Sequence, residues 1–459
     1  MEEDIDILNT AANCLKFSQD LDSSVRCTEI YIKKSKYLNI EIEENSIKNS
    51  EMGSDYGASI RAFDKRGSLG FAYTNKLNRS SIELMIKTAI KMMRAGTEDP
   101  EFKDLPPSYS LYPNVKGLFD KSVKELQIED SLGYVKELIT ACNEDDMAIS
   151  QAAYFTANYS KVLIVNSNGL EASRKKTNCV ISSRMVARDK VSKDTSFGSE
   201  WQSVRNLKDI NSVKIAQKAL NNAKNNLNRK KIQSMKCPLI LTPNGAISLI
   251  LEPLISAINA ETFQYKRSFL VGKRGSLIGS KYLTVQDISL LDGAAGSGAF
   301  DDEGVPCQDR KIIERGQFLE SGLLHNSYTA NKEGVESTGN ASRSSYSSVP
   351  SIGCSNFVLN PGGHSKKEMI SDVKLGILLD YTGDSPNIAS GDFSGLILQG
   401  SLIKNGEIVN PLNETMLAIN LLDLFANIDD VSKESSTYGS LQAPYVKIND
   451  VSILGSGDI

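Results

Sequence analysis

Apolar and polar residues alternate at residues 28–45, and this alternation limits the possible folds of the chain more than any other feature. The stretch TEIYIKKSKYLNIEIEEN at residues 28–45 has a period of two, which predicts a half-buried strand pair. Two further apolar runs at residues 56–75 flank Asp64 to Gly67, where glycine permits the positive φ of a tight hairpin. The chain is therefore expected to begin as an antiparallel sheet.

Helices with one apolar face are expected to cover this sheet. Their periodicity predicts them at residues 4–18, 80–96, 131–143 and 212–227. Ser80 lies three residues before Glu83, which is the spacing of a capping box at the start of the second helix. Asn168 and Gly169 separate two later strands and favour a type I′ turn.

The second half of the chain is richer in strand patterns, glycine and turn residues. Asn405 and Gly406 are a hairpin signal, residues 414–428 predict a late helix, and residues 444–454 predict a last strand pair. The expected fold class is α+β. We predict an N-terminal and middle α+β domain at residues 1–231, with an antiparallel sheet and covering helices. A mainly antiparallel β domain with a few helices follows at residues 232–459.

Composition points to a cytoplasmic protein that binds neither nucleic acid nor a membrane. The formal net charge of -4 gives no general attraction for polyanions. The acidic first residues MEEDIDILNT lack the pattern of a signal peptide, and no apolar run approaches the roughly 20 residues that span a bilayer. Seven scattered cysteines without a C-x-x-C pair are typical of buried free thiols in a reducing compartment.

Histidine is too scarce for a site built from several imidazoles in one chain. Only His325 and His364 occur. His325 lies in an apolar, strand-like run, and His364 follows a glycine pair that predicts an exposed loop. Each is interpreted as a structural or surface histidine.

An acidic cluster lies in the sequence FDDEGVPCQDR at residues 300–310. Its four acids are Asp301, Asp302, Glu303 and Asp309. Paired carboxylates of this kind can do acid–base work or bind a hard cation. The alternative is a turn in which aspartate caps the backbone, Gly304 permits the bend and Arg310 neutralises the acids.

An apolar stripe runs through GAISLILEPLISAINAE at residues 245–261. Its members, at helical spacing, are Ile247, Ile250, Leu251, Leu254, Ile255 and Ile258. The stripe predicts a helix that packs into a core. Pro253 predicts a kink, or a helix that restarts with this proline in its first turn.

Several long motifs occur in an order and spacing that resemble the TldD/PmbA family, and in particular its PmbA branch, also called TldE. They are DDEGVPCQ (301–308), GLLHNSYTANK (322–332), GVESTGNASR (334–343), NFVLNPGG (356–363) and GDFSG (391–395). The first half agrees, with GASIRAFDKRGSLGFAYTNKL and VNSNGLEASRKKTN. The resemblance covers nearly the whole chain.

The resemblance implies a cytosolic proteolytic system of two homologous subunits, in which the metal-bearing branch carries H-E-x-x-x-H on a helix and a further cysteine ligand. Zinc held there would activate a water for peptide hydrolysis. Matched from Leu241, the two histidine positions fall on Leu251 and Ser256, and only Glu252 of the motif remains. The cysteine position falls on Tyr438. The resemblance therefore implies no metal ligand and no catalytic residue in this chain.

We therefore expect a PmbA/TldE-like subunit that pairs with a zinc-bearing TldD-like homologue, or with itself, and holds extended peptides or unfolded small proteins. Residues expected to form a substrate rim, or structural turns, are Asp302, Glu303, Gln308, Asn340, His364 and Asp392. One alternative is a self-associating, metal-free peptide-binding protein without proteolytic activity. Others are a hydrolase that binds a cation through Glu252 and the acids near Asp302, and, from the family's older label, a DNA gyrase modulator.

Overall fold

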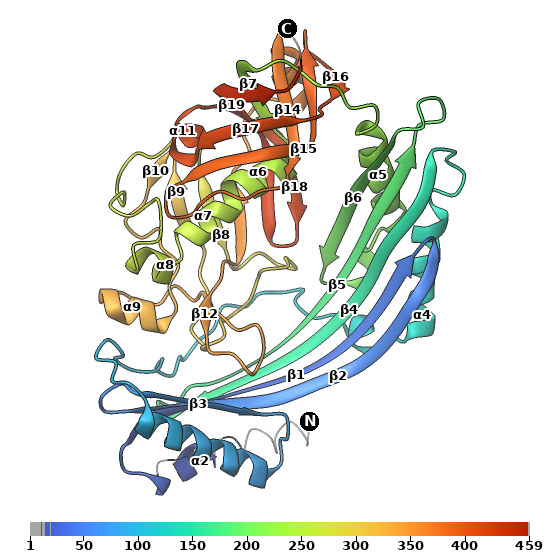
Figure 1. Cartoon of the computed structure of the whole chain (residues 1–459). Coiled ribbons are helices and arrows are strands. Elements are labelled where there is room, and N and C mark those ends of the chain that lie inside the picture. Colours follow the sequence, from blue (N-terminus) through green and yellow to red (C-terminus); the bar gives the residue numbers. More distant parts are fainter. Residues whose placement is uncertain (1–10, 12–13, 19, 458–459) are drawn as a thin grey trace.

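The structure is a computed structural model that describes residues 11, 14–18 and 20–457. It has an α+β fold with two large sheets (Figure 1). The first sheet takes all its strands from residues 25–204, and the second takes its strands from residue 235 onward. The predicted fold class is confirmed.

The first sheet has six strands within the described residues, in the order β3-β2-β1-β4-β5-β6, and every neighbouring pair is antiparallel. The strands are β1 (Val25–Glu43), β2 (Ser46–Asp64), β3 (Leu69–Thr74), β4 (Ala148–Asn166), β5 (Glu171–Arg188) and β6 (Thr195–Val204). Strands β1, β2 and β4 are 19 residues long, and the sheet curves strongly along them (Figure 1).

Three turn regions correct or confirm the sequence-based prediction for this sheet. Residues 28–45 do not form a strand pair, because β1 continues unbroken to Glu43 and the chain turns only at Glu44 and Asn45, which take φ of 49° and 61°. The hairpin at residues 56–75 is confirmed as β2 and β3, with Gly67 at φ 79°. The β4–β5 turn is present, but Gly169 alone of its pair has a positive φ, so it is not type I′.

One face of the first sheet is apolar and is covered by helices. These are α2 (Arg79–Ala95), α3 (Lys121–Glu125), α4 (Ile128–Thr140) and α5 (Ser212–Asn225). Ile30 and Ile32 pack with the apolar side of α2, while Ile40 and Ile42 pack with α4 and α5. Because side chains alternate along a strand, the odd-numbered residues of β1 face the C-terminal half of the chain.

The helix boundaries differ from the prediction by a few residues. Asn78, not Ser80, caps α2, since its side chain accepts a hydrogen bond from the backbone N–H of Ser81. The predicted helix at 131–143 begins earlier, as α4, and the predicted helix at 212–227 is α5. Of the predicted helix at 4–18, the described residues 11 and 14–18 are helical, and the others lie outside the described residues.

The second sheet has 11 strands within the described part of the chain, in the order β10-β9-β8-β13-β19-β17-β15-β14-β7, with β16 beside β15 and β18 beside β19. The strands are β7 (Met235–Leu241), β8 (Val285–Ile288), β9 (Arg310–Glu314), β10 (Gln317–Phe318), β13 (Asn356–Leu359), β14 (Leu375–Thr382), β15 (Asp392–Lys404), β16 (Glu407–Pro411), β17 (Thr415–Asn420), β18 (Ile428–Tyr438) and β19 (Leu441–Gly455). Strands β11 (Ala341–Ser342) and β12 (Ser351–Ile352) form a separate pair.

Most of these pairings are antiparallel, as predicted, but β13–β19 and β14–β7 are parallel. Strand β19 also pairs with β7, so that β19, β17, β15, β14 and β7 close into a ring. The Asn405–Gly406 hairpin is confirmed between β15 and β16, with φ of 52° and 79°. The apolar residues of these strands pack with those of residues 246–258 in the largest apolar core of the described residues.

The end of the chain departs from the prediction. Residues 415–420 form strand β17, and only α11 (Leu421–Ala426) is helical in the predicted helix at 414–428. The predicted strand pair at 444–454 is one strand, β19, which forms a hairpin with β18. No helix of the described residues is long and apolar enough to cross a bilayer.

Candidate functional site

The segment that aligns with the metal motif is an interrupted helix inside the core of the second sheet. Thr242 caps its start by accepting a hydrogen bond from the backbone N–H of Gly245. It runs as α6 (Pro243–Ala246), a π-helical turn η2 (Ile247–Leu251) and α7 (Glu252–Ala257). Pro253 lies in the first turn of α7, so the predicted restart is confirmed.

The residues at the aligned ligand positions have different environments. Leu251 is fully buried in the core, whereas Glu252 and Ser256 are exposed. Ser256 donates a hydrogen bond from Oγ to the carbonyl oxygen of Glu252 at 3.2 Å. Partial desolvation raises the pKa of Glu252. Tyr438 is half-buried against Trp201 at the end of β18, with its hydroxyl 3.5 Å from Glu200 Oε2.

These side chains do not fit the donor set of a zinc site. An aliphatic side chain at position 251 has no lone pair to give, and the Ser256 hydroxyl is already directed to a backbone carbonyl. Across the described residues, no group of three or more His, Cys, Asp or Glu side chains is placed to hold a metal ion. We therefore assign no reaction step to a metal in this chain.

The acidic loop at residues 301–305 is a tight turn buried between the two sheets. Asp301 accepts hydrogen bonds from the backbone N–H groups of Glu303, Val305 and Ala341 at 2.8–3.0 Å. Gly304 has φ 82°, a conformation that glycine adopts without strain. The backbone-capping turn is therefore confirmed for Asp301 and Gly304.

The predicted neutralising role of Arg310 is wrong. Arg310 is the first residue of β9, and its guanidinium donates a hydrogen bond to the carbonyl oxygen of Ser321 at 2.6 Å. Three other arginines compensate the acids of the loop. Arg61 from β2 pairs with Glu303 and Arg174 from β5 pairs with Asp302, while the charge of Arg343, from the loop after β11, also favours ionised Asp302.

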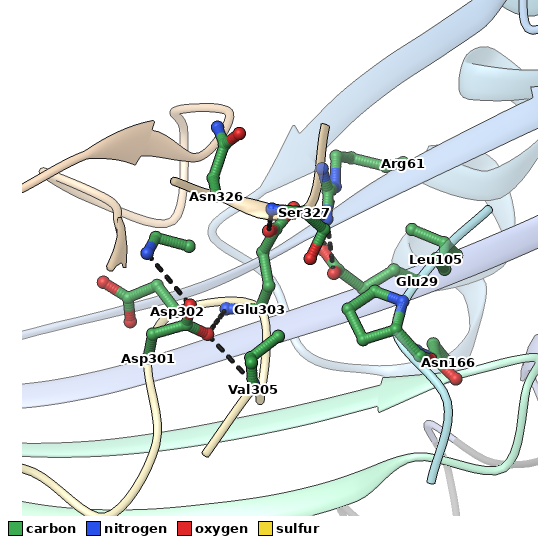
Figure 2. A network of polar contacts seen from close by, with 12 residues as sticks. Glu29, Arg61, Leu105, Asn166, Asp301, Asp302, Glu303, Val305, Asn326 and Ser327 are labelled. Atoms are coloured by element: carbon green, nitrogen blue, oxygen red, sulfur yellow. Dashed lines mark hydrogen bonds and ion pairs between the residues drawn. The ribbon is translucent and has the colours of Figure 1, made fainter. Parts of the chain in front are cut away.

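Glu29, Arg61, Glu303 and Arg343 form a buried network that joins the two sheets, and Figure 2 shows the first three of them. Arg61 donates through Nε and Nη2 to both carboxylate oxygens of Glu29 at 3.0 and 2.6 Å, and through Nη2 to Glu303 Oε1 at 2.9 Å. Arg343 also donates to Glu29. The second oxygen of Glu303 accepts from the backbone N–H of Ser327 at 2.8 Å. Each of these four side chains is no more than 8% exposed, and the two anions and two cations neutralise one another.

A second branch of the network centres on Asp302. Its carboxylate accepts hydrogen bonds from Tyr31 Oη at 3.1 Å, from the backbone N–H of Arg343 at 2.8 Å, and from Arg174. Arg174 also donates to the carbonyl oxygens of Phe300 and Asp301. Side chains of β1 and β5 in the first sheet thus bond to one side of the loop, and the segment around Arg343 bonds to the other side.

The charges set the protonation states of this network. Burial alone would raise the pKa values of Glu29 and Asp302, but the adjacent guanidinium groups lower both. Burial and the neighbouring Glu303 carboxylate raise the pKa of Asp301 to about 8. The ionised acids are thus too weakly basic for general-base catalysis, and the oxygens of Asp301 are occupied by backbone N–H groups. The network suits a structural joint better than an acid–base pair.

The remaining predicted rim residues do not come together. Asn340 is buried and bonds to Asp287 Oδ2 at 2.8 Å and to the carbonyl oxygen of Gly353. Gln308 is exposed and lines a cavity of about 580 Å³ beside the acidic loop. His364 is exposed, with Nδ1 2.8 Å from Asp430 Oδ2, and Asp392 is exposed, accepting from Asn420 Nδ2 at 2.9 Å.

The two histidines match their interpretation as structural or surface residues. His325 is 4% exposed, and burial lowers its pKa to about 4, so it is neutral at pH 7. The sequence pattern identifies the acids of the loop, but it does not identify Glu29, Tyr31 and Arg61 as residues of the same network. The available signal was a charged or hydroxyl side chain inside an apolar strand run, as in GASIRAFD.

Comparison with known proteins identifies the family. The sequence matches the PmbA/TldA metallopeptidase domain 1 over residues 28–93, the central domain over residues 121–227 and the C-terminal domain over residues 234–455. It is 26% identical over 466 residues to a metalloprotease PmbA homolog of Buchnera aphidicola, covering 99% of this chain and 98% of that protein. It is 29% identical to an uncharacterized protein of Methanocaldococcus jannaschii, covering 91% of this chain and 94% of that one.

Solved structures agree over nearly the whole length. A crystal structure of a modulator of DNA gyrase from Bacteroides thetaiotaomicron superposes with a TM-score of 0.86 at 26% identity, covering 97% of this chain and 98% of that one. TldE from Thermococcus kodakarensis superposes with a TM-score of 0.87 at 23% identity, covering 97% and 100%. From its three domain matches and these relatives, the chain belongs to the PmbA/TldA metallopeptidase family.

Proposed function

We propose that this chain is the metal-free, PmbA/TldE-like subunit of a metallopeptidase system, and that it pairs with a metal-bearing TldD-like homologue. In this proposal the homologue supplies zinc and the hydrolytic step. This chain contributes structure and holds extended peptides or unfolded small proteins.

The observation that carries the proposal is the environment of Leu251. The metal-bearing branch of the family is expected to have its first histidine at this position. This chain has a fully buried leucine there, packed with the apolar residues of the ring. Ser256 and Tyr438 stand at the other two ligand positions, and each already has a polar partner inside this chain. An apolar core residue needs no metal to be stable, which supports a role outside the chemical step.

The sheet edges support a role in holding peptides. Among the described strands, β6 pairs only with β5, and β16 pairs only with β15. An extended peptide can add to such an edge through backbone hydrogen bonds with little preference for its sequence. Unfolded segments are the substrates that this mode of binding selects.

A reducing, cytoplasmic setting is also part of the proposal. The seven cysteines are free, six of them buried and Cys354 half-buried. Burial raises the pKa of the Cys27 thiol to about 12, which keeps it protonated and unreactive. Thiols in this state suit a compartment that does not form disulfides.

The test is reconstitution with a metal-bearing homologue from the same genome. The purified chain, the homologue and their mixture are assayed with an unstructured peptide, with and without a chelator, and the metal content of each is measured. We expect cleavage by the mixture that exceeds cleavage by the homologue alone, no cleavage by this chain alone, and loss of cleavage on chelation. A stoichiometric metal bound to this chain alone, or chelator-sensitive cleavage by it alone, would contradict the proposal. Peptide binding with no cleavage in any mixture would favour the self-associating binding protein.

A further inference from the structure

A lysine without a partner lies on the face of β5 that meets the C-terminal half of the chain. Lys176 is half-buried, and its ammonium forms no hydrogen bond or ion pair with any residue that the structure describes. It shares this face with Arg174, two residues earlier, and with Ser160, which lies directly opposite on β4. A lysine that loses part of its hydration usually gains an anionic partner, so this amine is an exception among the charges of the chain.

The glycine-rich segment at residues 293–298 covers the end of this side chain. A Cβ atom added to Gly298 would lie 2.9 Å from Lys176 Nζ and 3.4 Å from its Cε. The amine therefore lies directly against the backbone of this glycine. The contact takes away part of the water that would otherwise hydrate an ammonium group.

Positive charge is in excess around the amine. Arg174 pairs with Asp302, whereas Arg205, which follows β6, donates to three backbone carbonyl oxygens and has no carboxylate partner among the described residues. Lys33 of β1 lies on the same face, in the row of residues that contains Arg174. Lys176 and Arg205 thus bring two cations to a place where no acid neutralises them.

Burial and the neighbouring arginines disfavour the charged form of the amine. Burial has the largest effect, Arg174 and Arg205 add like-charge repulsion, and together they lower the pKa of Lys176 to about 7. Cys307 and Asp302 act in the opposite direction but do not offset them. The ordinary pKa of lysine is about 10.4, so at neutral pH this side chain has far more of the unprotonated amine, which is the nucleophilic form.

We propose that Lys176 is a carbamate site, at which the side-chain amine binds carbon dioxide. The lone pair of Nζ attacks the carbon of the gas, the N–C bond forms as one C=O π bond opens onto oxygen, and Nζ releases one proton to water. The product is an anion between Arg174 and Arg205, and it supplies the negative charge that this face lacks. The inference is independent of the peptidase proposal, because it requires neither a metal nor a second subunit.

The first measurement determines the basicity of the amine in the unmodified chain. Lysines are labelled with a trace of acetic anhydride over a range of pH, and each is quantified by mass spectrometry. The labelling rate of Lys176 should reach half its maximum near pH 7, whereas that of Lys175, an exposed lysine on the opposite face of β5, should follow the ordinary value of about 10.4. No substitution is needed, so misfolding cannot produce the result. A midpoint for Lys176 above about pH 9 would overturn the inference.

The second measurement detects the carbamate itself by carbon NMR of the full chain in isotopically labelled bicarbonate near neutral pH. The α-amino group gives one carbamate signal, and Lys176 is expected to give a second one. Lys176→Arg, which keeps a positive charge, should lose the second signal, and the matched control Lys175→Arg should keep it. Lys176→Gln repeats the test with a side chain that is neutral, as the unprotonated amine is. Spectra of the wild type and Lys176→Arg that are the same, or a loss of the second signal in Lys175→Arg, would overturn the inference.

Discussion

The helix at residues 247–257 and the loop at residues 301–305 are both motif regions of the family, but they are stabilised in opposite ways. The helix packs hydrocarbon against hydrocarbon, with Leu251 fully buried. The loop keeps acids in a buried place and surrounds them with arginines from β2 and β5 and from the segment after β11. An apolar residue is stable in the core without a specific partner. A buried charge requires each of its partners to be present, so the loop depends on distant parts of the chain and the helix does not.

The largest expected effect comes from removing one cation of the network. Arg343→Ala leaves Glu29 buried with only Arg61, and breaking a buried pair typically lowers the free energy of unfolding by about 3–5 kcal/mol. Denaturant unfolding measures the change. Arg79→Ala is the matched control, because its ion pair with Glu83 lies on the surface, where ion pairs contribute little, so a much smaller loss is expected. Equal losses in the two variants would remove the contrast drawn above.

Truncation in the helix should have a comparable or somewhat smaller effect. Leu251→Ala creates a cavity in the core, and substitutions of this kind cost about 2–5 kcal/mol. Leu251→Met keeps the volume and should cost less than about 1.5 kcal/mol. The same unfolding experiment applies, with Ser256→Ala as the exposed control on the same helix. If Leu251→Met were as harmful as the alanine variant, tight core packing would not be the role of this position.

Acid should weaken the loop but not the helix. The pKa values of Asp302 and Glu29 are lower in the folded chain, so the unfolded chain binds protons more readily. Their stabilisation is complete above about pH 4, near the ordinary carboxyl pKa values, and is lost as the pH falls through the lowered ones. The difference in melting temperature between the wild type and Asp302→Asn should therefore shrink between pH 7 and pH 3. The exposed Ser256→Ala variant, at a side chain that does not titrate in this range, should show no such trend.

The smallest effect is expected at Glu252, the one residue of the metal motif that this chain keeps on the helix. Its raised pKa shows that the surroundings disfavour the charge, and its side chain is exposed. Glu252→Gln should change the free energy of unfolding by no more than about 0.5 kcal/mol, as exposed substitutions usually do. It should also leave cleavage by the reconstituted pair unchanged. A large loss of cleavage with normal folding would give this residue a role that the proposal denies.

The sequence predicted local features well where one short pattern decided the outcome. The hairpin around Gly67, the helix restart at Pro253 and the capping turn at Gly304 each depend on a residue with a restricted or unusual backbone. The late helix at 414–428 was wrong because pairing with β15 and β19 holds residues 415–420 as a strand, which no local pattern shows.

The site was harder to predict for the same reason. The acids of the loop were identified, but Arg310 was chosen as their partner because it is close in the sequence. The actual partner Arg61 is separated from Glu303 by 242 residues, and Arg343 from Glu29 by 314. Only the sheet order and the alternation of side chains along β1 and β2 bring them together.

The separation between Glu29 and Arg343 also has a consequence for synthesis. Proteins are made from the first residue onward at about 5–20 residues per second, and early segments fold as they emerge. The first sheet is complete in sequence by Val204, but Glu29 and Arg61 still lack Glu303 and Arg343 at that time. For roughly 10–30 s at this rate, the sheet exposes the face that later receives the C-terminal half. When the ribosome-bound chain ends near residue 230, this face of the sheet is thus uncovered and accessible to a chaperone.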